Sequence, residues 1–165
     1  MDPAFFFVTL ATLIAALHLH RERQELSRLR ALEILLVWFL VVAVGLNGIV
    51  TGLAQVLMDS RLTTQTGALQ VNYEIAGANL AIGTLGILSC RYQDNFRLAP
   101  IFASLIFGWC YGIGRIVEQF VRADFSVYST AQIFLYQFGM PVLLIAIWAL
   151  QKREIRKLSD IPSSA

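Results

Sequence analysis

Five long, mostly apolar segments dominate the sequence, and each is close in length to a membrane-spanning helix. They cover about residues 3–20, 32–57, 70–90, 98–120 and 132–150. A spanning helix needs roughly 20 mostly apolar residues. Because backbone polar groups in lipid must pair within the chain, we expect each segment to be helical. The sequence therefore predicts an all-α fold, a polytopic transmembrane helix bundle of five spans in one transmembrane domain, residues 1–165.

The low content of charge supports a membrane protein. Hydrophobic residues make up 57% of the chain and charged residues only 15%. Soluble domains contain about 25% charged residues, so this chain could not cover a globular surface facing water. A soluble enzyme, a disordered tail and a nucleic-acid-binding domain are excluded, and a net charge of +2 is too small for attraction to DNA.

The basic residues between the segments predict how the chain is oriented. If the connections alternate between the two sides of the membrane, ten basic residues lie on one side and only Arg61 and Arg122 lie on the other. Because cytoplasmic loops are rich in lysine and arginine, we expect the N-terminus outside and a basic cytoplasmic tail, residues 151–165. The larger group is Arg21, Arg23, Arg28, Arg30, Arg91, Arg97, Lys152, Arg153, Arg156 and Lys157.

The first segment leaves two arrangements open. It has no basic residues before its apolar run, so we expect a permanent span and not a cleaved signal peptide. Asp2 and Pro3 fit a helix N-cap and first helical position. A four-span arrangement, with this segment lying on the membrane surface, explains the charges equally well. The alternating charges from Arg21 to Glu33 indicate a solvated helical extension or a segment along the headgroups, with docking to a partner as the alternative.

Small residues at helical spacing predict where the helices pack, because close approach drives helix association in lipid. The second and fourth segments carry GxxxG pairs, and the third segment has small residues on two nearly opposite faces. We therefore expect the third segment to lie between the second and the fourth, with oligomerisation through one of these faces as the alternative. The predicted packing glycines are Gly48, Gly52, Gly77, Gly83, Gly108 and Gly112. In the fifth segment Pro141 predicts a kink, because it cannot donate to the Gln137 carbonyl.

Ionisable residues inside spans are costly and indicate function by default. The antiparallel order of the third and fourth segments places Glu74 and Arg115 at similar depth, so the two can form an ion pair. Three interpretations stay open: a clamp that fixes helix register, a pocket for a lipid headgroup or quinone, and a proton or ion step in transport. The predicted intramembrane polar cluster is Glu74, Asn79, Tyr111, Arg115 and Glu118.

The sequence contains no pattern that supports catalysis or a metal site. We find no nucleophile–base pair and no HExxH, and Cys90 and Cys110 are not in a CxxC motif. His18 and His20 would point about 200° apart on a helix, which is unsuitable for sharing one metal. We therefore expect no cofactor, no metal and no enzymatic activity.

Two stretches carry a resemblance to a known family. The first is Asn72-Tyr-Glu-Ile-Ala-Gly-Ala-Asn, and the second is Gly108-Trp-Cys-Tyr-Gly-Ile-Gly-Arg. Over residues 32–150 the chain resembles DoxX-like small bacterial inner-membrane proteins of unknown function. The resemblance implies a four-helix core and an inner-membrane location, and it does not cover the first segment. Members often have histidine where this chain has Arg115, which weakens a metal or proton-relay role. Some broadly DoxX-like proteins are quinone-linked redox subunits, and others assist assembly of membrane complexes.

Small size, apolar composition and glycine-rich faces together predict a non-catalytic integral subunit of a larger membrane complex. Its expected partners are other integral membrane subunits and lipids, in a homo- or hetero-oligomer, without nucleic acid. The alternative is a small transporter or a lipid- or quinone-binding protein that uses the polar cluster.

Overall fold

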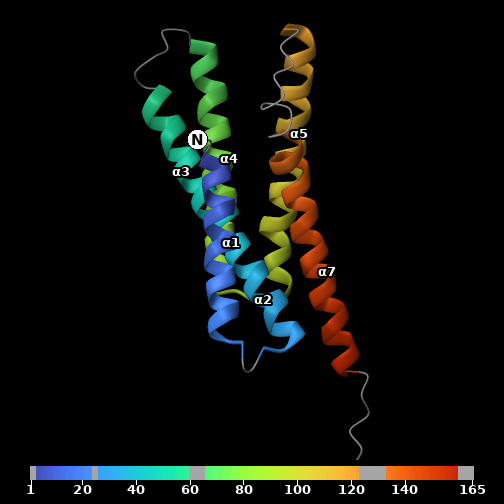
Figure 1. The fold of residues 1–165 in the computed structure, drawn as a ribbon. Helices are drawn as coiled ribbons and strands as arrows, with labels where there is room; N and C mark the ends of the chain where they lie inside the picture. Colours follow the sequence, from blue (N-terminus) through green and yellow to red (C-terminus); the bar gives the residue numbers. More distant parts are fainter. Residues whose placement is uncertain (1–2, 24–25, 60–65, 123–132, 160–165) are drawn as a thin grey trace, which may run out of the picture. The chain divides into compact units, whose positions relative to one another are not determined.

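The computed structural model describes residues 3–23, 26–59, 66–122 and 133–159, and all regular structure in these residues is helical. This confirms the predicted all-α fold (Figure 1). The elements are α1 (Pro3–Arg21), α2 (Arg28–Trp38), η1 (Phe39–Leu46), α3 (Asn47–Asp59), α4 (Thr66–Leu88), η2 (Asp94–Arg97), α5 (Leu98–Arg122), η3 (Ile133–Gly139) and α7 (Met140–Ser159).

The helices start and end near the predicted limits, with two extensions. α2, η1 and α3 follow one another without a break from Arg28 to Asp59, so the second segment is longer than predicted. α7 continues to Ser159, which makes much of the predicted tail helical. An ion pair of 2.8 Å between Lys157 and Glu154, one turn apart, supports this extension. The predicted N-cap at Asp2 lies outside the described residues.

Among the described residues, four helical stretches are long and apolar enough to cross a membrane: Ala4–Arg21, Arg28–Leu57, Asn95–Val121 and Phe134–Ser159. Tyr73–Leu88, the part of α4 whose side chains are described, is a shorter apolar stretch. Large apolar side chains are exposed on these helices, including Leu17 at 70% and Val121 at 80%. Because proteins in water rarely expose so much apolar surface, the chain is a membrane protein with several spans. Five spans and the orientation of the ends stay predictions.

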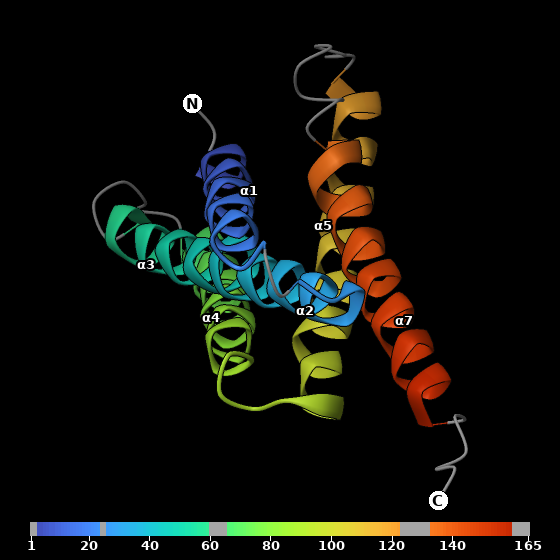
Figure 2. The same cartoon turned by 60° about the horizontal axis from the view of Figure 1, so that its bottom comes forward.

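The chain forms two compact units. Unit 1 comprises residues 1–14 and 37–100, and unit 2 comprises residues 15–36 and 101–165. In unit 1, α3 and α4 run side by side in opposite directions (Figure 1). In unit 2, η3 packs against α5 and leads into α7 (Figure 2).

Each unit has its own buried apolar residues. In unit 1 the largest are in η1, where Leu40 and Val42 are fully covered or nearly so. In unit 2, Ile101 of α5 and Leu144 of α7 have no exposed surface. η1 is a π-helical stretch, in which the Asn47 N–H donates to the Val42 carbonyl five residues back. Such wide turns are uncommon and are often found at functional positions.

Candidate functional site

Helices of unit 1 meet at a glycine seam, formed by Gly45, Gly48 and Gly52 on one side and Gly83 and Gly86 of α4 on the other. A Cβ atom on Gly48 would lie 2.7 Å from the Asn79 carbonyl oxygen. One on Gly83 would lie 2.7 Å from the Ile49 nitrogen, and one on Gly86 would lie 2.6 Å from the Leu40 carbonyl oxygen. Any side chain at these positions would push the two backbones apart. The seam is the small-residue contact that the sequence predicts for the second and third segments.

A polar bond crosses the same interface. The Asn79 side-chain amide donates to Gln55 Oε1 at 3.1 Å. The sequence predicts that Asn79 belongs to the polar cluster with Glu74 and Arg115, and the structure shows a partner for it in α3. Because amide side chains in lipid need hydrogen-bond partners, this bond fixes the register of α3 relative to α4. Asn79 therefore belongs to the packing interface of unit 1.

The opposite side of α4 is an outer face of small residues, Gly77, Ala81 and Thr84, all exposed. A Cβ atom on Gly77 would meet no atom within 4 Å. The predicted packing role of Gly77 is therefore not seen among the described residues, because the glycine seam has turned the other face of α4 toward α3. Glu74 continues the outer face toward the start of the helix and is also exposed.

A second pair of glycines brings α5 close to η3 in unit 2. A Cβ on Gly108 would lie 3.0 Å from the Gln137 carbonyl oxygen, and one on Gly112 would lie 2.9 Å from the Phe138 ring. Pro141 has no N–H to donate to that same Gln137 carbonyl. The helix is π-helical up to Gly139 and α-helical from Met140, one residue before Pro141. The kink at Pro141 stays a prediction. Gly108 thus lets α5 approach the carbonyl that Pro141 leaves without its helical donor.

The remaining members of the predicted polar cluster lie in different units. Arg115 Nη1 donates to Glu118 Oε2 at 2.9 Å, one turn further along α5 in unit 2. The ring of Tyr111 stacks on Phe107, with centroids 6.4 Å apart, and its side chain is exposed. Glu74 belongs to unit 1. An ion pair between Glu74 and Arg115 therefore stays a prediction.

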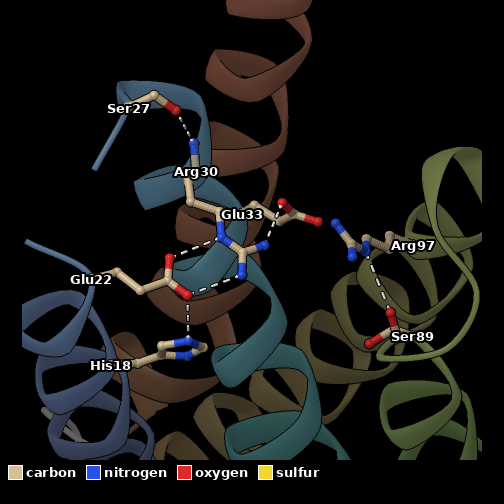
Figure 3. Close-up of polar contacts among 7 residues, drawn as sticks. All are labelled: His18, Glu22, Ser27, Arg30, Glu33, Ser89 and Arg97. Carbon is tan, nitrogen blue, oxygen red and sulfur yellow. Dashed lines mark hydrogen bonds and ion pairs between the residues drawn. The ribbon is translucent and has the colours of Figure 1, made fainter. Parts of the chain in front are cut away.

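The structure reveals a turn cluster of His18, Glu22, Arg30 and Glu33 (Figure 3). The last three belong to the stretch of alternating charges from Arg21 to Glu33. Arg30 donates to both oxygens of Glu22, at 3.0 and 3.1 Å, and to Glu33 at 3.2 Å. His18 Nε2 lies 3.1 Å from Glu22 Oε1. The hydrogen bonds from Arg30, more than those from His18, lower the pKa of Glu22 below its ordinary value. The spacing of His18 and Glu22 was a readable signal, but the contact of Glu22 with Arg30 depends on the turn between them.

The turn cluster joins the end of α1 to the start of α2. Ser27 is the N-cap of α2, because its Oγ accepts a hydrogen bond from the Arg30 N–H at 3.2 Å (Figure 3). The same residue, Arg30, therefore starts the helix through its backbone and holds α1 through its side chain.

In unit 1 a buried arginine closes the end of α4. Arg97 is only 4% exposed, and its Nε donates to the Ser89 carbonyl at 3.3 Å (Figure 3). Carbonyls at the end of a helix lack intrahelical donors, and a cation is favoured there. Arg97 thus serves the end of α4 besides being one of the predicted cytoplasmic basic residues.

Candidate metal ligands do not cluster in the part of the chain that the structure describes. Within it, no three histidine, cysteine or acidic side chains lie close enough together to hold a metal ion. What the geometry offers is helix contacts: the glycine seam, the outer face of α4 and the α5–η3 crossing.

These features define a class, a small helical membrane protein whose helices meet through glycines. Residues 1–157 match the model of a family of unknown function, DUF6790, and the chain belongs to this family. The matched region includes the first apolar segment, which the DoxX-like resemblance leaves out. No curated protein and no solved structure matches the chain.

Proposed function

We propose that this protein is a non-catalytic integral subunit that packs against a larger protein complex in the bacterial inner membrane. The proposed orientation has the N-terminus outside and the C-terminus in the cytoplasm. The resemblance to DoxX-like proteins, some of which assist assembly of membrane complexes, agrees with this role.

The observation that supports the proposal most strongly is the pair of small-residue faces on α4. One face is used inside the chain, where Gly83 and Gly86 meet η1 and α3. The other, with Gly77 and Ala81, is exposed. Lipid tails gain little from small side chains, whereas another helix gains close backbone contact. A helix of the partner complex is therefore the proposed occupant of the outer face.

Photo-crosslinking in native membranes tests this role. A benzophenone side chain replaces Ala81, on the outer face, and a matched control replaces Ile113, an exposed apolar residue of α5. We expect the probe at position 81 to give an adduct with a second integral membrane protein, and the probe at 113 to give lipid adducts. Gly77→Leu should weaken that adduct without unfolding the chain, because space surrounds Gly77.

Other results of the crosslinking, or of isolation in detergent, would contradict the proposal. If position 81 gives only lipid adducts, or only adducts between copies of this chain, the proposal of a subunit in a larger complex is wrong. Recovery of the chain from its native membrane in mild detergent as a single monomer would count against the proposal in the same way.

A further inference from the structure

One end of unit 2 combines basic residues from three separate parts of the chain. The turn cluster ties the end of α1 to α2 through Glu22 and Arg30. An ion pair of 3.9 Å between Arg28 Nη1 and Glu154 Oε1 ties the start of α2 to α7. These two contacts bring together a set that we call the basic end: Arg21, Arg23, Arg28, Arg153 and Arg156, all exposed.

The acidic residues at this end do not balance its charge. Glu22 and Glu33 are both bound by Arg30, and Glu154 is bound by Lys157 at 2.8 Å. Among the residues that the structure describes, Arg21, Arg23, Arg153 and Arg156 form no ion pair. Four guanidinium groups at this end are therefore exposed without a described acidic partner.

The position of these groups along α7 matches the lipid headgroup layer. The apolar run of α7 ends at Leu150, and Arg153 and Arg156 follow on the same continuous helix. At about 1.5 Å per residue they lie roughly 5 and 9 Å beyond Leu150. The headgroup region of one leaflet is about 5–7 Å thick, so a helix with an ordinary tilt keeps both arginines in or next to it.

The end of α7 is also amphipathic. Its basic residues, Lys152, Arg153, Arg156 and Lys157, fall within about 140° of the helix circumference. Ile155 and Leu158 lie on another side and are exposed by 38% and 59%. Basic residues beside exposed apolar ones are typical of helices that lie against headgroups. An acidic protein surface would leave Ile155 and Leu158 without an apolar environment, which favours lipid as the occupant.

We propose that the basic end is a binding surface for anionic phospholipids, in which the arginines of α1 and α7 contact lipid phosphate groups. The proposal does not depend on the subunit role, since it concerns a different face and a different kind of ligand. Guanidinium groups pair with phosphate oxygens through two parallel hydrogen bonds, which makes arginine well suited to this contact.

Native mass spectrometry of the full chain in mild detergent tests the proposal. The probes are phosphatidylglycerol and phosphatidylcholine with identical acyl chains, added in equal amounts. We expect the wild-type chain to retain phosphatidylglycerol preferentially. Because each basic residue near an anionic surface is worth about 1 kcal/mol, or about a fivefold change, Arg153→Gln/Arg156→Gln should lower the preference by more than tenfold. Arg153→Lys/Arg156→Lys should keep most of it, and salt should weaken it.

A matched single-charge control separates a specific surface from general attraction. Arg91 is exposed and belongs to unit 1, so it is not a member of the basic end, and Arg91→Gln should change the preference much less than Arg156→Gln. If the double variant loses helicity, Arg21→Gln/Arg23→Gln provides the same test from α1. Four results would overturn the proposal. The first two are equal retention of both lipids by the wild type and an undiminished preference for phosphatidylglycerol in folded glutamine variants. The others are a loss in Arg91→Gln equal to that in Arg156→Gln, and tighter binding of a polyglutamate peptide than of phosphatidylglycerol, which would indicate an acidic protein partner.

Discussion

Gly83 and Gly77 lie on opposite faces of α4 and differ in what a single methyl group would meet. A Cβ on Gly83 would lie 2.7 Å from the Ile49 nitrogen and 2.8 Å from the Gly45 carbonyl oxygen, both of them backbone atoms. Because the backbone must move to make room, we expect Gly83→Ala to destabilise the protein by about 1–3 kcal/mol. The measurement is unfolding in mixed micelles, followed by circular dichroism as the fraction of SDS rises.

Gly77→Ala is the matched control, since nothing lies within 4 Å of its added Cβ. Alanine is favoured over glycine inside a helix by up to about 1 kcal/mol, so this variant should be as stable as the wild type or more stable. Equal loss of stability in both variants would contradict the glycine seam as described.

Residue spacing predicted the glycine contacts but not which face of α4 is used within the chain. Gly48, Gly52 and Gly83 pack as expected, because a GxxxG pair needs only a partner helix at close range. Gly77 contacts no neighbouring helix among the described residues. The sequence alone does not distinguish the two small-residue faces of α4. The hydrogen bond of Asn79 was not predictable for a similar reason: its partner, Gln55, is 24 residues away and can be identified only from the pairing of α3 with α4.

At the scale of helices, the turn between α1 and α2 is held by an ion pair whose pH dependence follows from Glu22. The pKa of Glu22 is lower in the folded chain than its ordinary value, chiefly because Arg30 donates to its carboxylate. The stabilisation is therefore present above the ordinary pKa and is lost as the pH falls through the lowered value. We expect the SDS fraction at the unfolding midpoint of the wild type to decrease as the pH falls below the ordinary pKa of a glutamate, and that of Glu22→Gln to decrease less.

The control for this prediction is Glu118→Gln, which removes an ion pair within a single helix, α5. In that variant, the contact between α1 and α2 should weaken with falling pH as it does in the wild type. The measurement is the rate of proteolysis in the connection between α1 and α2 at each pH. If Glu22→Gln and the wild type respond identically, the turn cluster does not hold the two helices together.

Helices were predictable because a continuous apolar run in lipid has few alternatives. The predicted first segment, 3–20, corresponds to α1, and the predicted fourth segment, 98–120, corresponds to α5. The π-helical stretches were not predictable, since η1 reads as an ordinary apolar helix. Its widened turn accompanies the close approach of Gly86 to the Leu40 carbonyl, a tertiary contact without a local signal.

For the molecule as a whole, composition carried the strongest information. A chain with 15% charged residues must place most of its surface against something other than water, and the structure exposes large apolar side chains such as Ile106 and Leu135. Function was less predictable, because the recognisable features are helix contacts, which many unrelated membrane proteins share. The two small faces of α4 and the basic end specify which surfaces to probe.

The number of spans is the central structural claim, and the positions of the two chain ends test it most directly. Five spans place the ends on opposite sides, whereas a first segment lying on the surface places them on the same side. In a background with Cys90 and Cys110 replaced by alanine, the single-cysteine variants Asp2→Cys and Ser159→Cys can be labelled with a membrane-impermeant maleimide in intact bacterial spheroplasts. We predict that Cys introduced at position 2 reacts at once and that Cys introduced at position 159 reacts only after the membrane is permeabilised. Labelling of both positions, or of neither, before permeabilisation would contradict five spans.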